Sequence, residues 1–148
     1  MPKLDLDQIP QTNATGYPPD YADKVQSRWY RRLAPASGIS DFGASHVVLK
    51  PGAWSSQRHW HEDEDELVVM LSGQAVLVDN NGRTPMRPGD IAAFPKGESN
   101  GHVLINESEA DCVFVAVGRP SASDCHYPDI DMHLFDGQGF KRKDGSKF

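Results

Sequence analysis

Short apolar runs separated by Gly, Pro and Asn follow one another between about residues 39 and 118, and this pattern limits the possible folds more than any other. Such runs are typical of strands, and their length and spacing exclude βαβ units. The expected strands are residues 46–49, 54–61, 67–71, 75–78, 91–94, 102–105 and 112–117. The chain is therefore predicted to be all-β, as a sandwich or a barrel.

Turn residues support this prediction. Asp79-Asn80-Asn81-Gly82 supplies residues that tolerate positive φ, so it should close a hairpin. Lys50-Pro51-Gly52 and Arg87-Pro88-Gly89 each combine a fixed φ with a left-handed position, as a tight turn requires. The chain contains 13 Gly and 11 Pro, which disfavours a helical bundle.

The segments that flank the strand-rich region differ from it. Residues 1–38 are polar and are expected to form an N-terminal arm that packs on a barrel of residues 39–120. Within the arm, apolar residues recur every four positions from Tyr21 to Leu33, which permits a short helix, although Arg28–Arg32 could equally be an edge strand. Residues 121–148 are expected to be a C-terminal tail with a solvated, charged end. All three parts are assigned to one structural domain.

Charge and hydropathy restrict the partners. The net charge of −6 disfavours nucleic-acid binding, which needs a basic surface. The longest apolar run has six residues, so no membrane span is expected, and the N-terminus lacks the apolar region of a secretory signal. We therefore expect a cytoplasmic protein in which Cys112 and Cys125 are reduced.

The candidate site begins with two histidines. His59 and His61 share one face of a strand, so their imidazoles can reach one ion at about 2 Å each. Glu66 follows a run of acidic residues whose turn could return its carboxylate to the histidines, and a tighter turn would place Glu64 there instead. His102, at the start of a later strand, is available as a fourth ligand.

These residues resemble the two sequence motifs of the cupin family. The first motif comprises Gly52, His59, His61, Glu66 and Gly73, and the second comprises Gly89, Pro95, Gly97, His102 and Asn106. The spacers before His59 and between Gly97 and His102 are slightly longer than the usual family pattern. The resemblance implies a double-stranded β-helix, or jelly-roll, barrel with one divalent metal bound by His59, His61, Glu66 and His102. It also implies a homodimer.

Three imidazoles and one carboxylate would leave free positions on an octahedral ion, and those positions suit oxygen ligands of a small molecule. The ion could be Fe, Mn, Ni, Co or Zn. We expect a metal-dependent dioxygenase, isomerase or lyase that acts on a small oxygen-rich metabolite. A non-enzymatic protein that binds or senses a sugar or an organic acid is the alternative.

Strand alternation adds three residues near the site. Gln57 shares the face of His59 and is a candidate to contact a ligand or to orient an imidazole. Arg58 and Trp60 should face outward, either toward a dimer partner or against the N-terminal arm. The remaining histidines are expected to be surface or supporting residues, and the role of residues 127–131 is left open.

Overall fold

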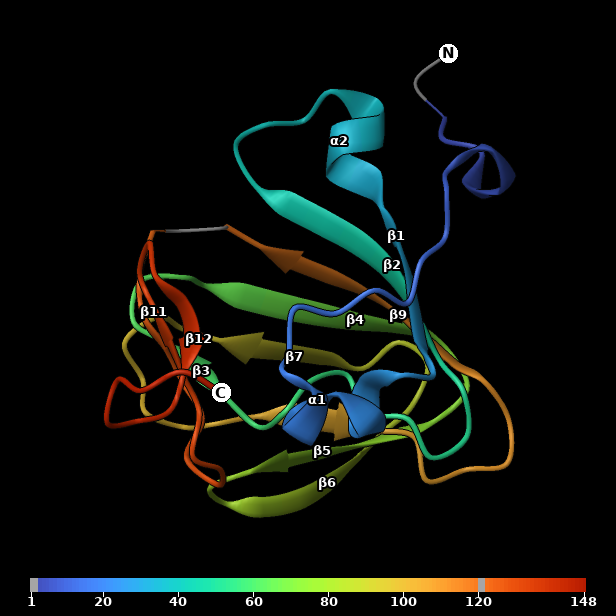
Figure 1. The fold of residues 1–148 in the computed structure, drawn as a ribbon. Coiled ribbons are helices and arrows are strands. Elements are labelled where there is room, and N and C mark those ends of the chain that lie inside the picture. Colours follow the sequence, from blue (N-terminus) through green and yellow to red (C-terminus); the bar gives the residue numbers. More distant parts are fainter. Residues whose placement is uncertain (1–2, 120–121) are drawn as a thin grey trace.

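The computed structural model describes residues 3–119 and 122–148, and strands dominate it (Figure 1). The expected boundary between barrel and tail, at residues 120 and 121, lies outside the described residues. The strands are β1 (Arg28–Arg32), β2 (Gly43–Leu49), β3 (Trp60–His61), β4 (Glu66–Ser72), β5 (Ala75–Asp79), β6 (Gly82–Met86), β7 (Ile91–Phe94), β8 (Val103–Ile105), β9 (Cys112–Gly118), β10 (Cys125–His126), β11 (His133–Phe135) and β12 (Gly139–Lys141).

Helices are few and short. The described residues contain α1 (Pro19–Ala22), α2 (Leu33–Ser37) and two 3-10 turns, η1 (Leu6–Gln8) and η2 (Asp23–Val25). The two alternatives that the sequence left open for the N-terminal arm are therefore both realised. Tyr21 and Val25 lie in helical turns, whereas Arg28–Arg32 forms an edge strand.

The larger sheet has five antiparallel strands in the order β1-β2-β9-β4-β7. A three-stranded sheet, β6-β5-β8, lies across from it, with the β5–β6 hairpin at the bottom of Figure 1. The hairpin turn is the predicted one, because Asp79 pairs with Gly82. Buried side chains from both sheets, including Met70, Phe114 and Leu104, form one core. The predicted all-β jelly-roll fold is confirmed.

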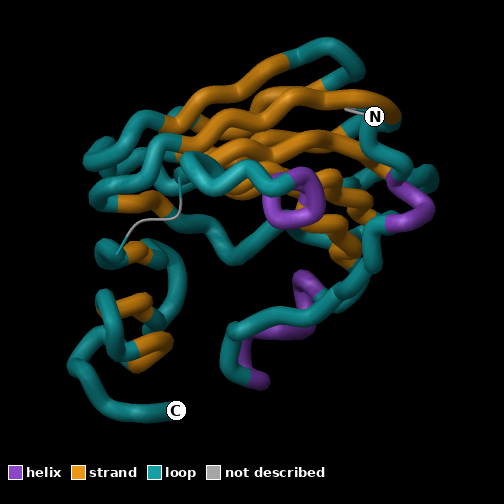
Figure 2. The backbone as a smooth tube through the Cα atoms, turned by 90° about the horizontal axis from the view of Figure 1, so that it is seen from above, coloured by secondary structure: helices purple, strands orange, loops and turns teal. Residues whose placement is uncertain are grey.

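A third sheet was not expected from the sequence. It has the order β12-β11-β10-β3, so the C-terminal segment pairs with the strand that carries His61. Figure 2 shows these short strands set apart from the long strands of the barrel. Cys125, Tyr127 and Met132 form a second buried cluster, which packs against Tyr17 and other side chains of the N-terminal arm. The two arms are therefore held together beside the barrel.

The predicted strand over residues 54–61 is wrong for most of its length. Only Trp60–His61 is a strand, and the chain bends at residues 55–58, with isolated bridges at Trp54 and His59. The segment still runs antiparallel to β8, since Ser55 N donates to Leu104 O at 2.8 Å. The bend matters because it breaks the strict alternation of side chains before the histidines.

Two glycine predictions are confirmed by the backbone. Gly52 and Gly89 adopt φ values of 81° and 91°, in the left-handed region. Gly73 is required for a different reason, because a Cβ there would lie 2.2 Å from the Asp111 carbonyl oxygen. The backbone before β9 therefore leaves no room for a side chain where β4 turns into β5. No helix in the described residues has the length and apolar character needed to cross a membrane.

Candidate metal centre

The backbone brings the histidines of the two motifs face to face. His59 N donates to His102 O at 3.2 Å, and His102 N donates to His59 O at 2.9 Å. His61 follows in β3, and Glu66 is the first residue of β4. Segments that are distant in the sequence therefore meet at one end of the barrel.

The side chains of all four predicted ligands converge on one carboxylate oxygen. Glu66 Oε2 lies 2.9 Å from His102 Nε2, 3.4 Å from His61 Nε2 and 3.5 Å from His59 Nε2. The donor atoms of His59, Glu66 and His102 all lie within 4.8 Å of one another. Ligands of one transition ion at about 2 Å each are separated by roughly 3–4 Å, so this donor set could hold such an ion.

Neighbouring groups orient the imidazoles. His59 Nδ1 lies 2.9 Å from the Gln57 carbonyl oxygen, so an Nδ1–H donated to that carbonyl leaves Nε2 free as a ligand. The His102 ring stacks on Phe94, with centroids 3.6 Å apart. Gln57 therefore acts through its backbone, and its side-chain amide instead donates to the Tyr21 carbonyl at 2.9 Å.

The cluster shifts the ionisation of its members. Burial raises the pKa of Glu66, but hydrogen bonds from the three imidazoles outweigh burial and hold that pKa well below its usual range. Burial opposes the charged form of His61, yet Cys125 and Glu66 raise its pKa to about 10. Burial is the main reason that the pKa of His102 is lowered. Without an ion, Glu66 and His61 therefore form a charged pair.

The carboxylate of Glu64, the alternative to Glu66, lies near Nδ1 of His61, whereas the carboxylate of Glu66 lies near Nε2. Glu64 Oε2 is 3.6 Å from His61 Nδ1, and burial raises the pKa of Glu64. The rest of the acidic run is exposed and makes contacts elsewhere, because Asp63 pairs with Lys96 at 2.6 Å and Glu62 lies 2.7 Å from His126 Nε2. The turn thus favours Glu66 as the carboxylate of the cluster.

Alternation predicts Arg58 and Trp60 on the outer face, and both contact the C-terminal segment, although Trp60 also lines a small pocket together with His61, Glu66 and His102. Arg58 makes two hydrogen bonds of 2.7 Å to Asp129, and Trp60 stacks on His126 with centroids 4.0 Å apart. Asp129 belongs to the 127–131 segment, whose role the sequence left open.

Sequence reasoning missed Cys125 as a neighbour of the cluster. Cys125 pairs with His61 across β10 and β3, and its sulfur lies within 4.8 Å of ring nitrogens of His59 and His61. Both cysteines are free and buried, as expected for reduced thiols. The adjacent Cys125-His126 pair was visible in the sequence, but only strand pairing places the thiol beside His61.

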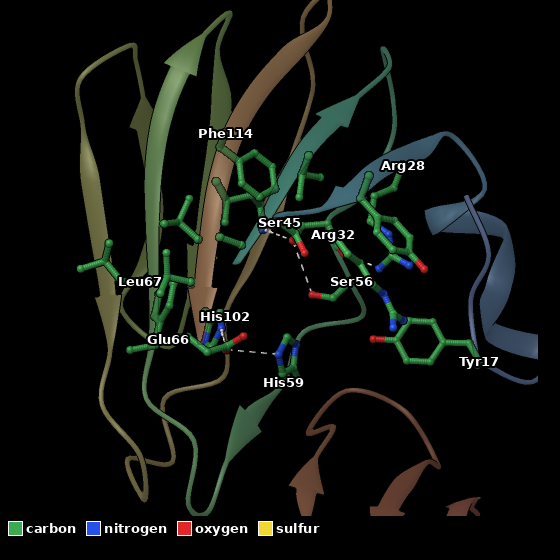
Figure 3. Close-up of a pocket in the computed structure, with 18 residues that line it drawn as sticks. Tyr17, Arg28, Arg32, Ser45, Ser56, His59, Glu66, Leu67, His102 and Phe114 are labelled. Carbon is green, nitrogen blue, oxygen red and sulfur yellow. Dashed lines mark hydrogen bonds and ion pairs between the residues drawn. The ribbon is translucent and has the colours of Figure 1, made fainter. Parts of the chain in front are cut away.

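A pocket of about 380 Å³ opens beside the cluster (Figure 3). His59, Glu66 and His102 line one part of it, and apolar residues such as Phe114 line its wall. The N-terminal arm and β1 contribute Tyr17, Arg28, Tyr30 and Arg32, none of which was predicted as a site residue. No sequence motif marks these residues, because the register of β1 places Arg28, Tyr30 and Arg32 at the pocket and the fold of the N-terminal arm places Tyr17 there.

Comparison with known proteins identifies relatives of two kinds. The family model described as a cupin domain matches residues 45–118. The chain is 44% identical to a sugar phosphate isomerase of the cupin superfamily from Silicibacter pomeroyi DSS-3, with a TM-score of 0.94 over 99% of this chain and 96% of that one. It is 27% identical to a protein from Acidithiobacillus ferrooxidans provisionally named a sugar phosphate isomerase, with a TM-score of 0.71 over 77% of this chain and 74% of that one.

The second kind of relative is a binding protein. Over 73 residues the chain is 38% identical to the oxalate-binding protein of Thermotoga maritima. This match covers 49% of the present chain and 58% of that protein, so it spans less than two thirds of the relative's length.

Proposed function

Because this chain belongs to the cupin family, we propose that it is a divalent-metal-dependent isomerase of a small hydroxy-carbonyl metabolite. The observation that carries the proposal is the approach of three Nε2 atoms to Glu66 Oε2, at 2.9–3.5 Å, beside a pocket of small-molecule size. A cluster of carboxylates alone would not indicate a transition-metal site, but imidazoles combined with one carboxylate suit a divalent transition ion.

The proposed ligands are His59, His61, Glu66 and His102, and the proposed ion is Fe, Mn, Ni, Co or Zn. When bound, such an ion supplies Lewis-acid polarisation of a carbonyl or hydroxyl oxygen. The chain's own contribution is to fix the imidazoles, through the Gln57 carbonyl at His59 and the Phe94 ring at His102. Burial raises the pKa of the Tyr17 phenol, so this pocket residue stays protonated as a hydrogen-bond donor.

Similarity to a protein named as an isomerase favours isomerisation over oxygenation or lyase chemistry. The relative that matches nearly the whole chain carries the name sugar phosphate isomerase, at 44% identity and a TM-score of 0.94. Aldose–ketose interconversion moves a proton between neighbouring carbons that bear oxygen, and such a substrate offers two oxygens to one ion. The cytoplasm, where phosphorylated sugars occur, remains our proposed location.

The test is reconstitution of metal-free protein with each of the five ions, followed by incubation with a panel of aldose and ketose phosphates in D₂O. We expect metal-dependent interconversion, with deuterium entering the product at the carbon that gains the proton, as seen by NMR. His61→Ala should abolish it through loss of metal, whereas the matched control His46→Ala, remote from the converging donors, should keep metal and activity. Oxygen consumption without isomerisation would instead indicate a dioxygenase.

A second candidate is a protein that binds a small acid without turnover. The 38% identity to an oxalate-binding protein over 73 residues favours it specifically. Metal-dependent thermal stabilisation by oxalate, together with no product from any sugar phosphate under any ion, would support this candidate and contradict the isomerase proposal.

A further inference from the structure

One face of β1 presents two arginines to the pocket. Arg28, Tyr30 and Arg32 alternate with Trp29 and Arg31, so the first three share a face, and all three line the pocket. In the antiparallel register Arg32 pairs with Ser45 of β2, which also lines the pocket. The arginines therefore belong to the inner wall of the sheet that also carries Glu66.

Neither arginine is neutralised by the protein. Among the residues that the structure describes, no carboxylate forms a salt bridge with Arg28 or Arg32, although the chain has 21 acidic and 15 basic residues. Arg28 is half-buried, and its Nη1 donates to the Ser55 carbonyl at 2.7 Å, while its Nε is buried without a partner. Arg32 is exposed. The Arg28 guanidinium is thus held in place without a counter-ion, and both guanidinium groups are available to an anionic oxygen ligand.

Hydroxyl groups accompany the arginines. Ser45, Ser56 and Tyr17 line the same pocket, and the Tyr17 hydroxyl is held by the backbone N–H of Gln57 at 3.2 Å. Figure 3 shows Arg28 and Tyr17 on one side of the pocket and Glu66 and His102 on the other. The pocket thus has a cationic, hydroxyl-bearing side and a side that carries the candidate metal ligands.

We infer that Arg28 and Arg32, assisted by Ser45 and Ser56, bind an anionic oxygen group of the substrate, either a terminal phosphate or a carboxylate. This inference rests on the proposed function, because it assigns the other end of the same small substrate to His59, Glu66 and His102. The two-sided pocket then fixes the direction of the substrate, with its charged end away from the reacting oxygens. The substrate class is a short hydroxy-carbonyl compound with one anionic terminus.

The experiment measures anion binding by metal-free protein, so that it does not depend on turnover. Inorganic phosphate and acetate are titrated separately by calorimetry, at fixed ionic strength, into wild type, Arg28→Gln, Arg32→Gln and Arg31→Gln. Arg31 is the matched control, since it lies on the same strand, faces the other side and donates from Nε to the Ile9 carbonyl at 3.1 Å. We expect about tenfold weaker binding for Arg28→Gln and for Arg32→Gln, and no change for Arg31→Gln.

The outcomes separate the two anion sources and the two proposals. Tighter binding of phosphate assigns a phosphorylated substrate, and tighter binding of acetate assigns a carboxylate; either supports the inference if the arginine dependence holds. Equal binding by wild type and Arg32→Gln, an exposed position at which circular dichroism should show an unchanged fold, would overturn it. Arginine-dependent anion binding without metal-dependent turnover would defeat the proposed isomerase while leaving this anion site intact.

Discussion

At the scale of single residues, Glu66 is the group on which the candidate centre depends. Its Oε2 faces three imidazole nitrogens, and it begins β4 directly after the acidic turn. In the metal-free protein this carboxylate is paired with the protonated His61, whose pKa is raised to about 10. Stability and metal binding should therefore both depend on pH.

The pH dependence of the metal-free protein has a definite sign. The pKa of His61 is raised from 6.5 to about 10, so its contribution to stability is full below about pH 6.5 and is lost as the pH rises through about 10. Glu66, whose pKa is lowered from 4.5, contributes above that value and loses its contribution as the pH falls through its folded-state pKa. Urea unfolding at a series of pH values should show falling stability between about pH 6.5 and about pH 10. His61→Asn should flatten that fall, and an equally steep fall in the variant would contradict the assignment.

Cys125 predicts a difference between soft and hard ions. Its sulfur lies within 4.8 Å of ring nitrogens of His59 and His61, so these three groups form a second donor set. Because thiolates prefer soft ions, Cys125→Ser should weaken Cd(II) binding about tenfold or more and leave Mn(II) binding nearly unchanged. Competition titrations with a chromophoric chelator measure both affinities. Cys112→Ser, the buried control outside this set, should change neither, and equal losses for both ions in Cys125→Ser would refute the prediction.

At the scale of elements, the C-terminal segment depends on contacts made by Arg58, the residue before His59 of the candidate metal centre. Arg58 donates to Asp129 through Nε and Nη2, and through Nη1 to Asn80 Oδ1 at 2.6 Å and the Gly101 carbonyl at 3.2 Å. It therefore joins the β5–β6 turn, the chain before His102 and the segment after β10. Removal of the Arg58 side chain should therefore loosen all three segments.

Arg58→Ala is expected to lower the free energy of unfolding by about 1–2 kcal/mol, since a forked, partly buried guanidinium loses several charged hydrogen bonds. Urea unfolding gives this value, and a double-mutant cycle with Asp129→Ala isolates the pair. Lys50→Ala is the matched control, because Lys50 and Asp111 pair at 2.8 Å with side chains 50% and 44% exposed, where about 0–1 kcal/mol is expected. Similar losses of unfolding free energy for Arg58→Ala and Lys50→Ala would argue against a structural role for the Arg58 guanidinium.

At the scale of the whole molecule, the outer face of the five-stranded sheet exposes apolar side chains over β4 and β7. The outer face of β4 and β7 carries Leu67, Leu71 and Ile91, with exposed fractions of 37%, 48% and 62%. Val69 pairs with Ile91 across the two strands, which makes the surface continuous. We propose this surface, defined by Leu67, Val69, Leu71 and Ile91, as the contact of the homodimer that the cupin resemblance implies.

Ile91→Glu should convert the dimer to a monomer, because a charge within an apolar interface would be buried without a partner. Sedimentation equilibrium measures the mass, and circular dichroism verifies the fold. Ile39→Glu is a suitable control, since Ile39 is 42% exposed outside this surface. A wild-type monomer would refute the dimer itself, and a dimeric Ile91→Glu would refute its location.

The sequence alone determined the all-β fold, most of the barrel strands and the four residues of the cluster. Alternation and turn chemistry act over a few residues, so the Asp79–Gly82 hairpin and the positive φ of Gly52 could be predicted from local sequence. The segment over residues 55–58 could not be, because its bend is set by hydrogen bonds to distant residues such as Tyr21 and Leu104.

Only the tertiary structure decided what surrounds the cluster. Cys125 reaches His61 through the pairing of β10 with β3, and Arg28 reaches the pocket through the register of β1 with β2. Strand pairing between distant segments leaves no periodic signal in either segment, because it depends on the loops and packing that bring them together. The candidate ligands therefore follow from local motifs, whereas the shape and charge of the pocket follow from contacts between remote parts of the chain.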